Sequence, residues 1–265
     1  MARSQSSLAV SADGERWLLL NASPDLRAQI LATPALQPKY GLRHSPIAAV
    51  YITNGDVDHI TGLITLREQQ AFTVFATSAI LSLVAPGTVF GVMNSGVVAR
   101  QPVALDESFE VLPGLTVTSF AVPGKVPLFL ESGTVETGAM SENTIGLEIR
   151  SGDKYFFYIP GCALMPPELL AKLTGAPLIF FDGTLFDDNE MVDAGLSQKT
   201  GKRMGHMSMS GTDGSIVAFA KADIARKVYV HINNSNPALI DESPQRREVE
   251  RAGWEVAHDG LEINL

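Results

Sequence analysis

The sequence is poor in cysteine, in positive charge and in long apolar runs, and each shortage excludes a class of protein. The single cysteine, Cys162, rules out an intrachain disulfide. The formal net charge of −9 at pH 7 makes the chain a poor partner for nucleic acid or for an anionic membrane. No segment contains the roughly 18 consecutive apolar residues that span a bilayer. The N-terminus has no apolar signal region, so we expect a cytoplasmic protein that does not enter the membrane.

The chain has enough apolar sequence for one large core. It contains 265 residues, of which 45% are apolar and 18% are charged, which is an ordinary globular balance. No repeat or low-complexity linker divides it. We therefore expect residues 1–265 to form a single α/β domain.

Strand-like and helix-like segments follow one another along the chain. A hairpin is predicted at residues 6–10 and 17–21, because an Asp-Gly turn lies between two apolar runs. Residues 210–221 are predicted to be helical and residues 254–265 to form the final strands, whereas residues 89–104 show no clear pattern. Further strands are predicted at residues 48–52, 72–76, 115–122, 143–150, 155–160, 178–181 and 227–232.

The stretch from Thr53 to Gly62 carries chemistry at the end of a predicted buried strand. It reads Thr-Asn-Gly-Asp-Val-Asp-His-Ile-Thr-Gly. Adjacent Asp58 and His59 offer an oxygen donor and a nitrogen donor, a pair that suits zinc or iron. A turn at the carboxyl end of a strand is also where α/β folds place their ligands. A polar loop with an N-capping aspartate is the alternative for this stretch.

Two other predicted core strands end in residues that can bind metal, Asp182 and His231. An acidic side chain at the end of a buried strand costs free energy unless it is paired or bound to a metal. The alternatives are an N-cap for Asp182 and a satisfied core position for His231. The shared position of Asp182, His231 and the Asp58–His59 pair at strand ends favours metal ligation.

Residues 54–59 resemble the His-x-His-x-Asp-His motif of metallo-β-lactamase-fold enzymes. The second half is kept as Asp58-His59, while Asn54 and Asp56 replace both histidines of the first half. The resemblance implies an αββα sandwich of two mixed β-sheets flanked by helices. It also implies that a three-His zinc site cannot form, so we expect one divalent metal. The ligands that the resemblance implies are Asp58, His59, Asp182 and His231.

Two imidazoles with one or two carboxylates can hold iron(II) that activates oxygen, or zinc(II) that activates water. Ligand chemistry alone does not decide between them. Asp56 is expected to be an extra ligand or a partner for an imidazole N–H. His206 follows Gly205 where related phosphodiesterases have a proton-donating histidine, so the resemblance implies an acid/base or substrate-binding role. A structural role is the alternative for His206.

Six segments over essentially the whole chain resemble the pyrroloquinoline quinone (PQQ) biosynthesis protein B family. The block His-Ile-Asn-Asn and the altered Asp-His motif are specific to that family rather than to the superfamily. Members usually begin upstream with a strand and a Cys-rich segment that can hold a structural zinc. This chain starts close to the family's Gln-Ser-Ser, so we expect no structural cysteine zinc site. The resembling segments are residues 3–7, 20–25, 58–63, 181–184, 204–206 and 230–237.

The resemblance implies a role in making PQQ, a redox cofactor that is built from cross-linked Glu and Tyr side chains. It implies an oxygenase, with iron(II) favoured, that hydroxylates the tyrosine ring of a small-molecule or dipeptide precursor. Catalysis would use His206 and Asp56, and substrate binding would use Asn54, Asn233 and Asn234. Contacts with other pathway proteins and a homodimer are left open. The alternatives are a carrier that assists transport of PQQ or its precursor to the periplasm, and a mononuclear zinc hydrolase.

Overall fold

The protein, seen in a computed structural model that describes residues 3–41 and 43–265, divides into two compact units. The first unit extends from the N-terminus to Phe120 and also includes residues 149–153 and 259–264. The second unit includes residues 121–148 and 154–258. A single domain over residues 1–265 stays a prediction.

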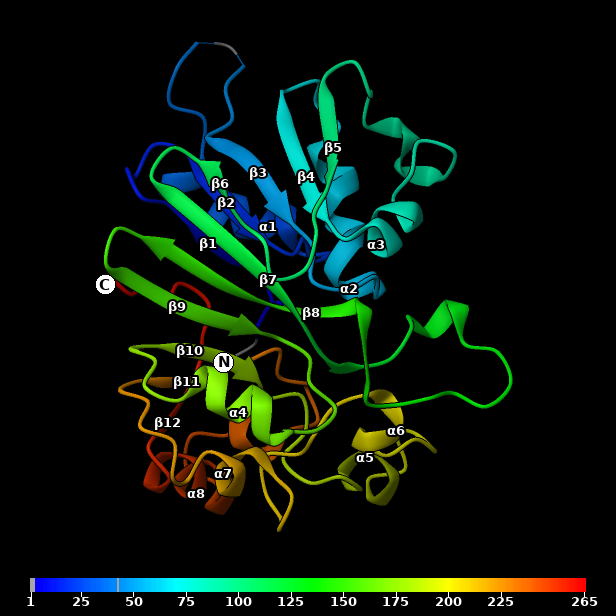
Figure 1. Cartoon of the computed structure of the whole chain (residues 1–265), viewed down its shortest axis with the longest axis vertical. Coiled ribbons are helices and arrows are strands. Elements are labelled where there is room, and N and C mark those ends of the chain that lie inside the picture. Colours follow the sequence, from blue (N-terminus) through cyan, green and yellow to red (C-terminus); the bar gives the residue numbers. More distant parts are fainter. Residues whose placement is uncertain (1–2, 42) are drawn as a thin grey trace. The chain divides into compact units, whose positions relative to one another are not determined.

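The first unit is built on a five-stranded sheet with the order β1-β2-β3-β4-β5. β1 and β2 form the predicted hairpin and pair antiparallel, while β2 to β5 pair parallel. Parallel neighbours need a crossover, and short helices supply it here (Figure 1). The strands are β1 (Leu8–Val10), β2 (Trp17–Leu20), β3 (Ile47–Tyr51), β4 (Phe72–Ala76) and β5 (Val98–Pro102).

Apolar side chains from this sheet and its helices form the core of the first unit. Val50, Ile52 and Val74 are fully buried, as expected for strands covered on both faces. Leu26 of α1 and Ile80 of α3 pack into the same cluster. The helices are α1 (Leu26–Ala32), α2 (Val57–Ile60) and α3 (Ser78–Leu83), with 3₁₀ helices η1 (Pro34–Leu36), η2 (Thr61–Leu66) and η3 (Val89–Val92). The chain then forms an antiparallel hairpin of β6 (Ser108–Leu112) and β7 (Leu115–Gly124), and β7 continues into the second unit.

The second unit carries strands in the order β12-β11-β10-β9-β8. β9, β10, β11 and β12 are parallel to one another, again with helical crossovers. Its core is aromatic: Trp254 stacks on Tyr229 with ring centroids 4.0 Å apart, and Phe181 packs edge-on against Phe219 at 5.0 Å. The strands are β8 (Ala139–Ser151), β9 (Lys154–Ile159), β10 (Ile179–Asp182), β11 (Lys227–Val230) and β12 (Trp254–Val256).

Most helices of the second unit are short. α8 (Pro244–Arg251) begins at Ser243, whose hydroxyl accepts the N–H of Arg246, as the Ser-Pro pair predicts. The others are α4 (Pro167–Leu173), α5 (Glu190–Asp193), α6 (Gly201–Met204) and α7 (Ser215–Ala218), with 3₁₀ helices η4 (Leu128–Leu130) and η5 (Pro237–Leu239).

Two predicted elements are wrong in extent. The helix expected over residues 210–221 is only α7, because Gly211 has a positive φ of 87° and Ser210 hydrogen-bonds to Phe186 instead of a helical partner. The final strands expected over residues 254–265 are only β12, since the last ladder bond is Ala257 N–H to Tyr229. Residues 89–104, which had no clear pattern, hold η3 and β5.

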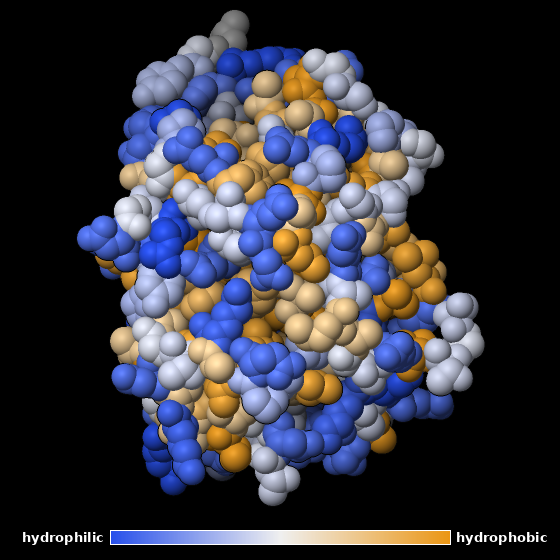
Figure 2. All heavy atoms as spheres, viewed as in Figure 1, coloured by the Kyte–Doolittle hydropathy of each residue, from blue (hydrophilic) through white to orange (hydrophobic). Residues whose placement is uncertain are grey.

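On the face drawn in Figure 2, charged and apolar residues are interspersed. The exposed apolar side chains include three successive residues of η4, Leu128, Phe129 and Leu130. In the described ranges 3–41 and 43–265, no helix combines the length and the hydropathy that crossing a bilayer requires.

Candidate metal centre

In the first unit, the turn after β3 holds four of the residues predicted for the site. Asn54 is buried, and its side-chain oxygen accepts the N–H of Asp56 at 3.0 Å, so this amide shapes the turn. Asp56 stands at the N-cap of α2, but its side chain makes no capping hydrogen bond in the described part of the chain. Val57 then starts the helical turn that carries Asp58 and His59. His59 is 1% exposed, and the Nδ1 of its imidazole lies 3.1 Å from Oδ1 of Asp58.

Contacts with the end of β2 fix this turn. The buried amide of Asn21 accepts the N–H of Thr53 at 2.9 Å and donates to its hydroxyl at 2.9 Å. The N–H of Ala22 donates to the carbonyl of His59 at 2.7 Å. Gly62 follows α2 with no room for a side chain, because a Cβ there would lie 2.1 Å from the carbonyl oxygen of Ser23. The predicted Asp58–His59 pair is therefore held rigidly by backbone packing.

In the second unit, strand register brings Asp182 and His231 together. Asp182 ends β10 and is paired in parallel register with Val230, the last residue of β11, so His231 directly follows that strand. Nδ1 of His231 lies 3.8 Å from Oδ1 of Asp182. His231 lies just beyond the strand and has a positive φ of 55°. This left-handed conformation costs a residue other than glycine about 1–2 kcal/mol.

Asp182 is fully buried, yet its carboxylate is well satisfied. It accepts the N–H of Cys162 at 3.0 Å, the N–H of Thr184 at 3.1 Å and the hydroxyl of Thr184 at 2.6 Å. Burial raises the pKa of this carboxyl, but the charge and hydrogen bond of His206, together with His231, outweigh burial and hold the pKa well below its usual range. The carboxylate is thus ionised, and its burial alone does not require a metal.

Thr184 links the three groups through one hydroxyl. Its Oγ1 lies 2.7 Å from Nδ1 of His231 and 3.1 Å from Nδ1 of His206, besides its bond to Asp182. A hydroxyl has one proton to donate, and the ionised carboxylate is its strongest acceptor. Nδ1 of His231 is then the donor toward Thr184, so this contact orients the imidazole ring.

His206 reaches the same carboxylate from a helix end. Gly205 closes α6 in the left-handed conformation, with φ of 89°, so that the chain turns directly after the helix and presents His206. Nδ1 of His206 lies 2.7 Å from Oδ2 of Asp182, and its ring stacks on that of His231 with centroids 5.3 Å apart. An ionised carboxylate can only accept, so Nδ1 is the donor here too. Nε2 is therefore the nitrogen of His206 that can serve as an acid, a base or a ligand.

Within residues 3–41 and 43–265, no hydrogen bond joins Asn233 or Asn234 to the carboxylate of Asp182. Asn233 hydrogen-bonds through its backbone to Thr184 and through its amide to Met191 at 3.1 Å. Asn234 is exposed. Their predicted role in substrate binding, like that of Asn54, stays a prediction.

Sequence reasoning missed two residues that support the site. Thr184 supplies the hydroxyl that contacts Asp182 and His231. The sequence Asp-Gly-Thr at the end of a buried strand was the signal that could have indicated it. Asn236 is 1% exposed and its amide donates to the carbonyl of Gly183 at 3.0 Å, which holds the turn after β10. An Asn before Pro237 was the available signal, because asparagine side chains commonly bond nearby backbone in turns.

Cys162 is excluded as a nucleophile or thiolate ligand. Burial and the nearby charge of Asp182 raise the pKa of its thiol far above the usual value. Its Sγ lies 3.1 Å from the carbonyl oxygen of Leu164, which suits a protonated thiol as donor.

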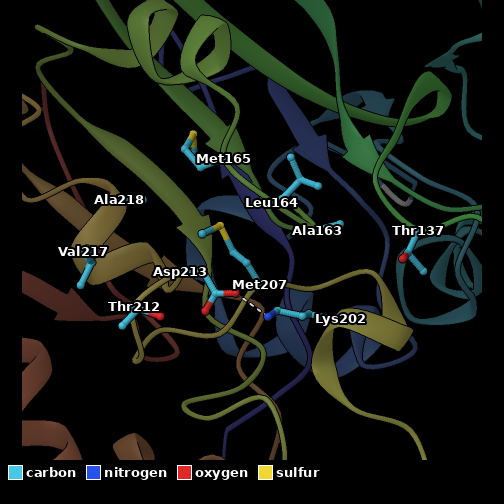
Figure 3. Close-up of a pocket in the computed structure, with 10 residues that line it drawn as sticks. All are labelled: Thr137, Ala163, Leu164, Met165, Lys202, Met207, Thr212, Asp213, Val217 and Ala218. Atoms are coloured by element: carbon cyan, nitrogen blue, oxygen red, sulfur yellow. Dashed lines mark hydrogen bonds and ion pairs between the residues drawn. The ribbon is translucent and has the colours of Figure 1, made fainter.

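A cavity of about 420 Å³ lies beside these elements in the second unit (Figure 3). Met207 and Ala163, which line it, directly follow His206 and Cys162, and the N–H of Met207 donates to the carbonyl of Cys162 at 2.7 Å. Figure 3 shows two of the lining residues, Lys202 and Asp213, pointing toward one another as an ion pair. Among the described residues, none of those predicted for the site lines this cavity.

Comparison with known proteins gives the family. The family described as the beta-lactamase superfamily domain matches residues 16–232. Coenzyme PQQ synthesis protein B of Methylorubrum extorquens (strain PA1) is 57% identical over 263 residues, which cover 99% of this chain and 88% of that protein. The chain belongs to the coenzyme PQQ synthesis protein B family. A family member from Xanthomonas euvesicatoria pv. vesicatoria (strain 85-10) is 56% identical over 264 residues, with the same coverage of 99% and 88%.

Solved structures agree with this family and its fold. The crystal structure of zinc-bound PqqB from Methylobacterium extorquens matches with a TM-score of 0.97 at 57% identity, over 99% of this chain and 88% of that chain. A diphosphatase of the PhnP family shares the fold, with a TM-score of 0.65 at 20% identity, over 98% of this chain and 83% of that one. The predicted metallo-β-lactamase fold, with two mixed sheets flanked by helices, is confirmed.

The donors of the second unit fit a divalent metal. Asp182, His206 and His231 each offer a ligand atom, and these atoms lie within 4.8 Å of one another. Imidazole nitrogen with carboxylate oxygen is a donor set for zinc or iron, and Nδ1 bonds of the kind described above orient such imidazoles. Of the four predicted ligands, Asp58 and His59 belong to the first unit and Asp182 and His231 to the second. Their joint binding of one metal stays a prediction.

Proposed function

We propose that this protein is a metal-dependent oxygenase of PQQ synthesis that hydroxylates the tyrosine ring of a Glu-Tyr-derived precursor. The proposal rests first on the family, whose members are named for coenzyme PQQ synthesis. It rests second on one observation in the second unit. Both Nδ1 atoms of His206 and His231 are engaged with Asp182 or Thr184, and this fixes the orientation of two imidazoles beside one buried carboxylate.

In this proposal one iron(II) is held by Asp58, His59, Asp182 and His231, and when bound it supplies oxygen activation. The residues of the chain do the rest. Thr184 and Asp182 fix the ring orientation and tautomer of His231. His206 takes up or releases the phenol proton at Nε2, while Asp182 stabilises the protonated ring through Nδ1. Asp56, Asn54, Asn233 and Asn234 are proposed to contact the substrate or the ligands.

A mononuclear zinc hydrolase is the second candidate. The relative of 57% identity was crystallised with zinc, and the fold is shared with a diphosphatase. In that case His206 would protonate the leaving group. Both candidates need the metal, whereas a carrier of PQQ would bind its cargo without one.

The test begins with the metal content of the full chain, purified without oxygen. Iron(II) and zinc(II) are then added separately to the metal-free protein, and oxygen uptake is followed with a tyrosine-containing Glu-Tyr substrate. About one iron per chain that restores oxygen uptake supports the oxygenase. Zinc binding with hydrolysis and no oxygen uptake refutes it in favour of the hydrolase.

Single alanine variants at His59 and His231 separate these readings from a carrier. Each should abolish metal binding if both units contribute ligands. His44→Ala is the matched control, because His44 lies in an exposed loop against Tyr40 and accepts the N–H of Lys39. The carrier hypothesis would be the one left if two results occurred together. The unchanged chain would bind no metal, and the alanine variants at His59 and His231 would both still bind PQQ.

A further inference from the structure

The second unit contains a cluster of three cations around one carboxylate, which we call the Glu131 cluster: Lys125, Glu131, Lys199 and Arg203. Oε1 of Glu131 accepts Lys125 Nζ at 3.1 Å, and Oε2 accepts Lys199 Nζ at 3.3 Å. Arg203 grips both oxygens, at 3.4 and 3.0 Å. The side chains of Lys125 and Glu131 are each only 9% exposed.

The cluster holds more positive charge than its carboxylate needs. One arginine suffices to pair a carboxylate with two parallel hydrogen bonds, and Arg203 already does so. Among the described residues, Lys125, Lys199 and Arg203 form ion pairs with Glu131 alone, so three positive charges share one negative charge, in a chain whose net charge is −9. Like charges held together repel one another, so the arrangement is unfavourable until a further anion joins it.

The outer cations of the cluster can reach such an anion. The side chains of Lys199 and Arg203 are 36% and 39% exposed. Lys199 uses one of its three ammonium donors on Glu131, and among the described residues the Nε–H of Arg203 has no partner. Ammonium and guanidinium groups with open donors are what carboxylates bind.

The cluster also lies against the segment that presents His206. A Cβ on Gly205 would meet the side chain of Lys125 at 3.1 Å, so this lysine packs directly on the residue before His206. Arg203 lies on the same short helix, α6. Lys202, between Lys199 and Arg203 in sequence, differs because its charge is paired with Asp213.

We propose that the Glu131 cluster binds carboxylate groups of the substrate, through Lys199 and Arg203, with Lys125 and Glu131 holding those cations in place. This inference rests on the proposed function only in taking the ligand to be the substrate of the His206 site. Its ligand class is a small polycarboxylate. Glu131 acts as an internal stand-in that keeps the cations in position while no ligand is bound.

The test uses PQQ itself, a tricarboxylate, as the probe, with binding to the metal-free full chain measured by calorimetry. Lys199→Met and Arg203→Met should each weaken binding about tenfold, the effect expected for losing one charge-assisted hydrogen bond. Glu131→Gln should tighten binding, because it removes the competing negative charge while the amide oxygen can still accept a hydrogen bond from Arg203 and keep it in place. Lys202→Met is the matched control, since it removes one charge from α6 that Asp213 already neutralises, and it should leave the affinity within about twofold. Circular dichroism checks that each variant is folded.

Failure of this inference is distinguishable from failure of the proposed function. The inference is overturned if Lys199→Met and Arg203→Met bind PQQ as tightly as the unchanged chain does. It is also overturned if the unchanged chain does not bind PQQ, or if Lys202→Met loses as much affinity as the other two variants. Binding that depends on Lys199 and Arg203 supports it even where iron-loaded protein takes up no oxygen. Oxygen uptake with an unchanged KM in both cation variants refutes the inference while leaving the oxygenase intact.

Discussion

Replacing Thr184 with valine removes one hydroxyl from the centre of the second unit and keeps the shape of the side chain. In the structure that hydroxyl lies 2.6 Å from Oδ1 of Asp182 and 2.7 Å from Nδ1 of His231. The residue is buried, at 8% exposed, so water cannot replace the lost partner easily. Valine therefore leaves a buried carboxylate oxygen and a partly buried imidazole nitrogen each short of one hydrogen bond.

The expected magnitude follows from those two losses. A buried group left without its hydrogen bond costs about 1–3 kcal/mol, and more when the group is charged, so we expect Thr184→Val to lower the free energy of unfolding by about 2 kcal/mol. Removing a group that orients a metal-binding histidine typically weakens metal binding by about 10–100-fold. Thr184→Ser keeps the hydroxyl and should retain most of the metal affinity.

Two assays check this prediction. Urea unfolding of the metal-free chain measures stability, and competition with a coloured chelator measures the affinity for zinc(II). Equal metal affinity in Thr184→Val and the unchanged chain, at full folding, would refute the role given to the hydroxyl. A loss in Thr184→Ser as large as that in Thr184→Val would instead attribute the effect to packing.

Three further changes should be measurable. Arg203, with Lys125 and Lys199, outweighs the effect of burial and lowers the pKa of Glu131 from 4.5 to about 2. Because this folded-state pKa lies below the unfolded value, ionised Glu131 stabilises the fold above pH 4.5 and that contribution is lost as the pH falls toward 2. Urea unfolding at several pH values should show a shallower acid dependence in Glu131→Gln, and an identical slope would contradict the ion-pair network. Gly62→Ala should destabilise the first unit by about 1–3 kcal/mol, because its Cβ would lie 2.1 Å from the backbone oxygen of Ser23. Near-normal unfolding of that variant would mean that the approach of α2 to the β2 end is not tight. Trp254→Ala should cost about 3–5 kcal/mol, since this ring is 2% exposed and stacked on Tyr229; a loss below about 1 kcal/mol in the same assay would argue against that core.

Local sequence pattern was enough to predict which side chains are candidates for metal binding. Apolar runs that end in Asp58–His59, Asp182 and His231 are read from a few neighbouring residues, because strand formation and strand ends depend on local side-chain pattern. The short blocks around these ends were also enough to give the family and, through it, the fold. The start of α8 at Ser243 has the same local cause, because Ser followed by Pro favours a helix N-terminus.

Packing decided what local pattern could not. The helix expected over residues 210–221 shrank to α7 because Ser210 bonds to Phe186, a partner distant in sequence. Thr184 meets His231 only because β10 and β11 pair in one particular register, and Glu131 meets Arg203 across 72 residues of chain. Such contacts depend on how strands and loops fold back on one another, so no short window of sequence contains them. The sequence thus determined which side chains are candidates for chemistry in this protein. Tertiary structure decided which ring nitrogen of His206 and His231 is engaged, and it brought three cations together around Glu131.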